Sequence, residues 1–263
     1  MPHQSDDEPT EIKYSALGYE IRRYRALSST NEVAKKIARN INRERVVVIA
    51  DTQLLGRGRL GRRWSSPSGG IWLSIILRPK ISPKDTPRLT FIASSAVAAT
   101  IKKTFGIRTE IKWPNDVLIN ARKVCGILTE TNLQSGDVEY AIVGIGLNAN
   151  VDLEALPAPV RNTSTTLKHE LGQKISLRAL TENVLKAFER RYRLLQQGLW
   201  FALLQEWKGM ASFLGEKVRI TSFDEVLTGE AWDVDEDGTL IIRLEGGELR
   251  KILVGDVTLL KNL

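Results

Sequence analysis

A glycine-arginine stretch near residue 60 has the strongest chemical character in this chain. It reads Gly-Arg-Gly-Arg-Leu-Gly-Arg-Arg-Trp from Gly56 to Trp64, and Ser-Ser-Pro-Ser-Gly-Gly follows it. Glycine lets backbone N–H groups approach a ligand closely and permits positive φ angles. The arginine guanidinium presents paired donors that match a phosphate or a carboxylate. The stretch therefore predicts a flexible loop that would be ordered by an anion, most readily by a phosphate-bearing ligand.

Three other interpretations of this loop can be compared. Gly56, Gly58 and Gly61 match the spacing of the dinucleotide-binding fingerprint, and an apolar run precedes them. That fingerprint requires a helix at its third glycine, whereas serine, proline and glycine follow Trp64 here and cannot start one. A Walker A loop is excluded because no Gly-Lys-Ser/Thr follows. A solvated basic loop without a ligand remains open.

Two further clusters place polar groups beside apolar runs. The motif Lys-Trp-Pro-Asn-Asp ends at Asp116 and would bring a lysine, an amide and a carboxylate to a strand end, although Asn-Asp is also an ordinary turn. Ser-Ser-Thr-Asn ends at Asn31, just before residues with helical spacing, and so marks a helix N-terminus. This cluster serves either as a cap alone or as a site that presents hydroxyls and amides to a ligand.

Composition limits the class of protein. The chain has 263 residues and a formal net charge of +7, which suits nucleic acid, an anionic substrate or an acidic protein partner equally. Its single cysteine excludes an internal disulfide, and with two histidines it offers too few ligands for a zinc site. We expect Cys125 to be a core thiol. No segment resembles a signal peptide or is long enough to span a membrane, so we expect a cytoplasmic protein.

Apolar runs and glycine-rich turns predict the elements that carry these residues. Strands are expected over 20–27, 46–51, 71–77, 122–130 and 140–148, and helices over 32–38, 89–105, 177–197 and 199–208. From Leu214 onward, short strands separated by glycines predict a small SH3-like β-barrel. We therefore expect a flexible tail over 1–13, a larger domain that holds the site over 14–212, and the barrel over 213–263.

Five motifs in order resemble those of the biotin protein ligases. They are Ser-Ser-Thr-Asn, the glycine-arginine stretch with Ser-Pro-Ser-Gly-Gly-Ile, Lys-Trp-Pro-Asn-Asp, Arg-Lys-x-x-Gly-Ile-Leu-x-Glu and Gly-Ile-Gly-Leu-Asn, and the match spans about residues 20–260. The resemblance implies an α+β fold: a mixed sheet flanked by helices in a class II synthetase-like core, followed by the SH3-like barrel. Some relatives carry an N-terminal winged helix that represses transcription. The short segment before this core predicts a form without that domain and without a DNA partner.

The resemblance also implies a two-step reaction. Biotin attacks the α-phosphate of Mg²⁺-ATP and gives biotinyl-5′-AMP and pyrophosphate. A lysine of a biotin carboxyl carrier domain, from acetyl-CoA carboxylase or a related carboxylase, then attacks the mixed anhydride and releases AMP. Because a carboxylate and a triphosphate must meet in the first step, fixed positive charge and Mg²⁺ are needed.

The resemblance assigns roles to residues of the motifs. The catalytic residues it implies are Arg57, Arg59, Lys123 and Asp116, where Asp116 binds Mg²⁺ or orients Lys123. Biotin, whose ureido ring needs paired polar partners in a closed pocket, would be bound by Ser29, Thr30, Asn31, Gln53, Arg57, Gly58, Arg59 and Lys123. ATP or the adenylate would be bound by Arg59, Arg62, Trp64, Lys112, Asn115 and Asn148. Since an acyl-adenylate is labile to water, the glycine-arginine loop would act as a lid over it.

Two other functions remain as alternatives. A lipoate or octanoyl transfer enzyme shares the core fold, but Lys-Trp-Pro-Asn-Asp, the arginine-rich loop and the barrel favour biotin. A basic nucleic-acid-binding module would suit the charge, yet aromatic residues are not interleaved with the basic clusters and no helix-turn-helix is evident. A homodimer is a further hypothesis, in which a strand such as Tyr140 to Asn148 pairs at a sheet edge.

Overall fold

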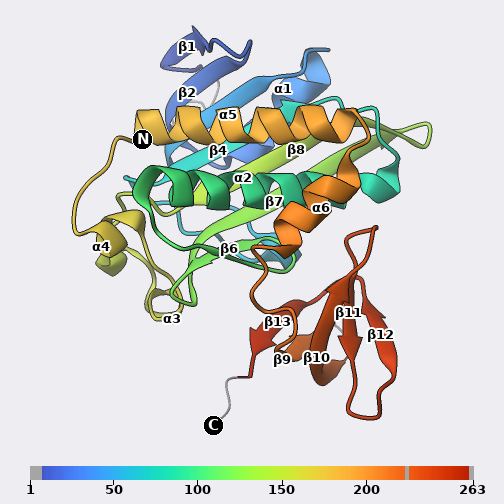
Figure 1. Cartoon of the computed structure of the whole chain (residues 1–263). Helices are drawn as coiled ribbons and strands as arrows, with labels where there is room; N and C mark the ends of the chain where they lie inside the picture. Colours follow the sequence, from blue (N-terminus) through green and yellow to red (C-terminus); the bar gives the residue numbers. More distant parts are fainter. Residues whose placement is uncertain (1–7, 223–224, 261–263) are drawn as a thin grey trace.

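Two sheets organise the chain, whose structure is a computed structural model that describes residues 8–222 and 225–260 (Figure 1). The larger sheet has eight strands in the order β1-β2-β3-β4-β8-β7-β6-β5, and the smaller has five in the order β12-β11-β10-β9-β13. In the larger sheet β2 and β3 are parallel, whereas the other neighbouring strands are antiparallel. The mixed sheet predicted for the core is therefore confirmed.

The predicted strands and helices are present, with small shifts at their ends. The strands of the larger sheet are β1 (Glu11–Tyr14), β2 (Glu20–Leu27), β3 (Val46–Gln53), β4 (Ile71–Leu77), β5 (Glu110–Lys112), β6 (Asp116–Ile119), β7 (Arg122–Gln134) and β8 (Asp137–Leu147). The strands of the smaller sheet are β9 (Lys217–Thr221), β10 (Val226–Val234), β11 (Leu240–Arg243), β12 (Leu249–Ile252) and β13 (Asp256–Leu259). The helices are α1 (Thr30–Asn40), α2 (Pro87–Phe105), α3 (Ala158–Arg161), α4 (Leu167–Leu171), α5 (Leu177–Gln196) and α6 (Trp200–Lys208).

Helices cover both faces of the larger sheet because its central strands are apolar on both sides. In β3, Val47 and Ile49 belong to the core that α2 and α5 cover, whereas Val46 and Val48 pack in a second cluster with α1. Successive side chains of a strand point to opposite faces, so an unbroken apolar strand requires this double cover. Figure 1 shows α2 and α5 side by side across one face, with α6 beside them.

The smaller sheet is attached to the core through the hairpin between β10 and β11. Trp113 Nε1 donates to Gly238 O at 3.0 Å, and Trp200 Nε1 donates to Glu236 O at 2.6 Å. Lys208 Nζ lies 2.6 Å from Asp233 Oδ1. The acidic turn of this hairpin thus joins the two sheets, and it links the C-terminal sheet to the Lys-Trp-Pro-Asn-Asp motif.

Two expectations about the periphery need correction. Residues 11–13 of the predicted tail lie in β1, which pairs with β2 although all its side chains are exposed, while residues 1–7 lie outside the described part. The strand expected at a sheet edge, β8, lies instead between β4 and β7. That argument for a homodimer is therefore wrong. Within the described ranges, no helix is long and apolar enough to cross a membrane.

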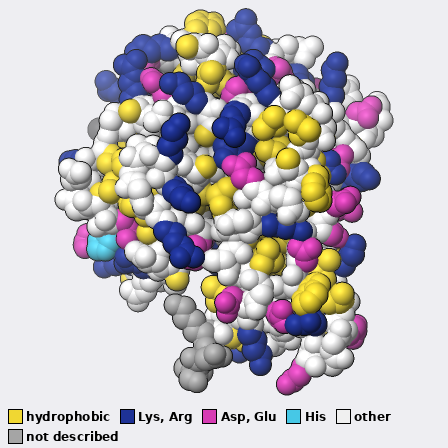
Figure 2. Space-filling model, viewed as in Figure 1, with side chains coloured by type: hydrophobic (Ala, Val, Ile, Leu, Met, Phe, Trp, Pro, Cys, Tyr) yellow, Lys and Arg dark blue, Asp and Glu magenta, His cyan; other side chains and the backbone are white. Residues whose placement is uncertain are grey.

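Charges of both signs are spread over the surface. On the face shown in Figure 2, lysine and arginine side chains are interspersed with aspartate, glutamate and apolar groups. A continuous basic stripe, as a nucleic-acid backbone requires, is not seen on that face.

Candidate active site

The predicted site residues gather around one cavity of about 310 Å³ beside the N-terminus of α1. Its walls come from α1, the end of β3 and the loop after it, the β6–β7 hairpin and β8. The predicted residues that line it are Ser29, Thr30, Asn31, Gln53, Arg57, Gly58, Arg59, Arg62, Trp64, Asn115, Asp116, Lys123 and Asn148. Lys112 does not line the cavity, but its Nζ lies 3.8 Å from Oδ2 of Asp116, which does.

The glycine-arginine loop closes back on itself directly after β3. Trp64 N–H donates to Gly56 O at 2.8 Å, and Gly58 N–H donates to Arg62 O at 2.7 Å. Between these bonds lies a single 3₁₀ turn, Arg59–Gly61, so no helix begins at the third glycine. The dinucleotide fingerprint is thereby excluded. A Cβ on Gly56 would collide with the carbonyl oxygen of Trp64, which explains the glycine at the neck of the loop.

The indole of Trp64 covers the glycines of two neighbouring strands. A Cβ on Gly146 of β8 would lie 2.6 Å from Trp64 Nε1, and one on Gly126 of β7 would lie 3.0 Å from its Cζ3. Trp64 also meets the fully buried Trp72 edge to face, with 6.4 Å between ring centroids. The glycines of these two strands thus leave room for the flat indole of Trp64.

Lys123 is held by a carboxylate from the neighbouring strand. Its Nζ lies 2.6 Å from Asp116 Oδ1 and 5.1 Å from the centroid of the Trp64 ring. The β6–β7 hairpin brings the two residues together, since Lys123 pairs with Leu118 beside a register shift. Asp116 is buried and has a lysine near each oxygen, an arrangement that orients Lys123.

Arg59 and Arg62 of the loop line the cavity, and each contacts a polar or acidic side chain of another element. Arg59 Nη1 donates to Asn115 Oδ1 at 3.2 Å, and burial lowers the pKa of this guanidinium. Arg62 donates to Asp256 of β13, and this bond raises the pKa of Arg62. Arg59 lies 3.9 Å from the same carboxylate. The C-terminal sheet therefore contributes a charged group to the cavity, which Asp256 lines.

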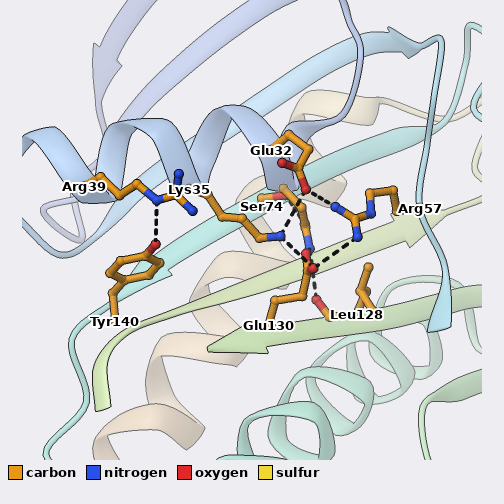
Figure 3. Close-up of polar contacts among 9 residues, drawn as sticks. Glu32, Lys35, Arg39, Arg57, Ser74, Leu128, Glu130 and Tyr140 are labelled. Atoms are coloured by element: carbon orange, nitrogen blue, oxygen red, sulfur yellow. Dashed lines mark hydrogen bonds and ion pairs between the residues drawn. The ribbon is translucent and has the colours of Figure 1, made fainter. Parts of the chain in front are cut away.

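Arg57 points toward a second group of charges beside α1 (Figure 3). It donates to Glu32 and lies 3.8 Å from Glu130, and Lys35 Nζ lies 3.0 Å from Glu32 and 2.7 Å from Glu130. Burial pushes the pKa of Glu32 up, but the bonds from Lys35 and Arg57 outweigh it, so the net shift of the pKa is downward. The first arginine of the loop is thus fixed to α1 and β7.

The N-terminus of α1 is not simply capped. Ser29 is the N-cap residue, yet its side chain makes no capping bond, and it is buried together with Thr30 and Asn31. Gln53 Oε1 takes the capping role instead, since it accepts from the Thr30 N–H at 2.8 Å. The interpretation of Ser-Ser-Thr-Asn as a cap alone is therefore wrong, because these side chains line the cavity.

Apart from Asp116 Oδ1, whose partner is the ion pair with Lys123, two buried polar atoms of the cavity residues have no hydrogen-bond partner among the described residues. They are Asn148 Oδ1, an acceptor, and Trp64 Nε1, a donor. Asn148 is oriented by its amide nitrogen, which donates to Thr165 O at 3.2 Å. Because a buried polar group without a partner is costly, these two atoms mark where a polar ligand would be stabilised.

Comparison with known proteins identifies the family. A model of the biotin/lipoate A/B protein ligase family matches residues 24–148, and a model of the biotin protein ligase C-terminal domain matches residues 213–260. The bifunctional ligase/repressor BirA of Bacillus subtilis is 36% identical over 94% of this chain and 76% of its own length. The chain belongs to the biotin protein ligase family.

Two more relatives agree with this assignment. The biotin–[acetyl-CoA-carboxylase] ligase of Paracoccus denitrificans is 31% identical over 83% of this ligase and 92% of its own length. The solved structure of the biotin protein ligase from Aquifex aeolicus in complex with biotin and ATP is 27% identical, with a TM-score of 0.79 over 92% of this ligase and 99% of that chain. The predicted fold of core and C-terminal domain is thus confirmed.

Sequence reasoning missed the partners of the predicted residues. Glu32, Glu130, Ser74 and Asp256 bond to cavity residues, yet none was assigned a role. For Ser74 a signal exists, since it is the polar residue in the middle of an apolar strand. Glu130 ends the Arg-Lys-x-x-Gly-Ile-Leu-x-Glu motif, whereas nothing near Asp256 in the sequence points to the loop.

Proposed function

We propose that this ligase activates biotin with ATP to biotinyl-5′-AMP and transfers biotin to a specific lysine of a carrier protein. The observation that carries the proposal is the convergence of the predicted residues on one cavity, with amides and hydroxyls around α1 and cationic and aromatic groups around Lys123. The Aquifex aeolicus relative, solved with biotin and ATP, supports the choice of substrates. The C-terminal match and the relatives named as biotin ligases favour biotin over lipoate or octanoate.

In the first step a biotin carboxylate oxygen would bond to the α-phosphorus of ATP, while the bond to pyrophosphate breaks. The two reactants repel each other, and preorganised positive charge lowers that repulsion without reorganisation during the reaction. Lys123 and Arg59 would supply this charge, and both are already oriented, by Asp116 and Asn115 respectively. Asn148 Oδ1 would accept from the exocyclic amine of adenine, and the Trp64 ring would cover the adenylate.

Mg²⁺ fits this site as part of the Mg²⁺-ATP substrate. The described residues contain no cluster of three or more acidic, histidine or cysteine side chains that could hold the ion alone. Mg²⁺ commonly binds through one or two carboxylates together with substrate phosphates. Of the two carboxylates that line the cavity, Asp116 and Asp256, Asp116 would be the one to bind it, although its ion pair with Lys123 favours an orienting role. The ion would neutralise charge on the phosphates.

In the second step the ε-amino group of the acceptor lysine would attack the carbonyl carbon of the mixed anhydride, and AMP would leave. The loop over the cavity would keep water away from the anhydride until the acceptor arrives. We propose the carrier domain of acetyl-CoA carboxylase or a related carboxylase as acceptor, which the name of the Paracoccus denitrificans relative supports.

The remaining predictions stay part of the proposal. The C-terminal match, which starts at residue 213, supports a catalytic domain over 14–212 and a separate domain over 213–263. We propose a cytoplasmic enzyme without a DNA partner, in line with the mixed charges of the face in Figure 2. A homodimer is retained as a hypothesis, without the argument from β8.

Labelling of a carrier domain tests the proposal directly. The enzyme is mixed with Mg²⁺-ATP, a purified biotin carboxyl carrier domain and biotin, and the mass of the domain is measured. We expect addition of one biotin to one lysine, dependent on ATP, and none with lipoate or octanoate. Labelling by lipoate instead of biotin, or no biotin-dependent ATP–pyrophosphate exchange at all, would refute the proposed function.

A further inference from the structure

Glu130 lies at the centre of the polar contacts in Figure 3, outside the lining of the cavity. One of its oxygens lies 2.7 Å from Lys35 Nζ, and the other accepts from Asn31 Nδ2 at 2.8 Å. Asn31 Nδ2 also lies 3.4 Å from Leu128 O. The carboxylate and the carbonyl are acceptors only, so the group of Asn31 that faces them must be the NH₂ group.

The oxygen of Asn31 is consequently turned to the other side, where Ser74 meets it. Ser74 Oγ donates to Asn31 Oδ1 at 2.5 Å, and this serine is fully buried in β4 without lining the cavity. A Cβ on Gly144 of β8 would collide with Asn31 Oδ1, so the glycine leaves room for the oxygen in this orientation. Since an amide oxygen has two acceptor positions, one remains for a ligand.

The same contacts continue to Gln53. Gln53 Oε1 accepts from the Thr30 N–H at 2.8 Å. The Thr30 hydroxyl lies 2.8 Å from Ser74 Oγ and 3.0 Å from Gln53 Oε1; because the one hydrogen of Ser74 goes to Asn31, the one hydroxyl hydrogen of Thr30 is directed to one of these two, and its oxygen stays an acceptor. Gln53 Nε2 donates one hydrogen to Ser66 Oγ at 2.7 Å, and its second hydrogen can donate to a ligand. The cavity thus offers acceptors at Asn31 and Thr30 and a donor at Gln53, a pattern complementary to a cyclic urea with two N–H groups and one carbonyl.

We propose that Glu130 and Ser74 are positioning residues that hold the Asn31 oxygen toward the ligand and thereby set selectivity for a ligand with unsubstituted ring N–H groups. This inference rests on the proposed function. Glu130 acts because a carboxylate cannot donate, so it excludes the rotated amide that would present NH₂ to the ligand. Ser74 acts from the opposite side, where its hydroxyl donates to Asn31 Oδ1 and stabilises this orientation of the amide.

Glu130→Gln is the decisive variant, because glutamine keeps the shape yet can donate to Asn31 and permit the rotated amide. Its matched control is Glu139→Gln on β8, which alters another Glu–Asn pair. Glu139 Oε2 accepts from Asn132 Nδ2 at 2.6 Å, and Glu139 does not line the cavity.

Biotin-dependent ATP–pyrophosphate exchange gives KM for biotin and for ATP. We expect Glu130→Gln to raise KM for biotin about 10- to 100-fold, the scale of a hydrogen bond to a charged group. KM for ATP should stay within about twofold of the wild-type value, and Glu139→Gln should leave KM for biotin and KM for ATP unchanged.

Selectivity is the measurement that a merely structural role would not move. The wild type should prefer biotin strongly to a biotin methylated on a ring nitrogen, and Glu130→Gln should lower this preference about tenfold or more. An unchanged preference and an unchanged KM for biotin would overturn the inference. If Glu130→Gln unfolds, as judged by circular dichroism, Ser74→Ala decides by the same two criteria. A wild type without biotin-dependent exchange would instead refute the proposed function.

Discussion

Replacing Gly146 with alanine tests whether the indole of Trp64 lies on the sheet as described. The new methyl group would lie 2.6 Å from Trp64 Nε1 and 2.7 Å from Trp64 Cε2, closer than non-bonded atoms approach. The sheet holds Gly146 from both sides, through Trp72 of β4 and Gly126 of β7, so the loop must move. Overpacking of this kind costs about 1–3 kcal/mol. At about 1.4 kcal/mol per factor of ten, the loop would be displaced about 5 to 150 times more often.

Trypsin can report this displacement because the loop contains Arg57, Arg59, Arg62 and Arg63. We expect Gly146→Ala to be cut in the loop faster by that factor, and to bind the adenylate more weakly in calorimetry. Gly246→Ala is the control, since a Cβ there meets nothing within 4 Å. If Gly146→Ala equals this control in cutting rate, adenylate affinity and Tm, the placement of Trp64 is refuted.

Four further predictions concern single residues. Lys123→Ala should slow biotin-dependent pyrophosphate exchange at least about a hundredfold, as loss of one preorganised charge does; exchange at the wild-type rate would contradict its role. Arg59→Gly should retain part of the first step but release biotinyl-AMP about tenfold faster in a filter-binding assay, and unchanged retention would count against the lid. Asp256→Asn should increase tryptic cutting of the loop by up to about fivefold, because a partly exposed ion pair with Arg62 contributes up to about 1 kcal/mol; an unchanged rate argues against the tether. Burial raises the pKa of Cys125, so less thiolate forms at a given pH and maleimide labelling should stay slow from about pH 7 to 9; rapid labelling of the folded enzyme would show that the thiol is accessible.

The positions of most strands and helices, and the residues of the site, could be predicted because each is encoded in a short stretch of sequence. Apolar runs such as that in β4 predict buried strands, and the five motifs predict residues that meet at one cavity. The strand β1 escaped prediction because it is a short edge strand that pairs with β2 while every one of its side chains stays exposed. Its Glu-Ile-Lys-Tyr run does alternate polar and apolar residues, but it has only the shortest length at which alternation indicates a strand, and neither apolar side chain is buried.

The partners of the site residues could not be predicted because they come from distant parts of the chain. Asn31 and Glu130 are 99 positions apart, and Arg62 and Asp256 are 194 positions apart. A motif identifies a residue that meets the ligand, but which carboxylate neutralises or orients it depends on the packing of whole elements. Sequence reasoning therefore assigned Arg57 to the ligand without the carboxylate beside it.

The bond between the β10–β11 hairpin and Trp113 has a consequence for exchanging parts between relatives. The buried indole of Trp113 donates to Gly238 O, and the motif that contains it supplies Asn115 and Asp116 to the cavity two and three positions later. A chimaera that joins this core to a foreign C-terminal domain without an equivalent carbonyl would leave that N–H without a partner, at a cost of about 1–3 kcal/mol. The catalytic core and the C-terminal domain are therefore matched at this contact. A chimaera should fold well only when the β10–β11 hairpin and Trp113 come from the same protein.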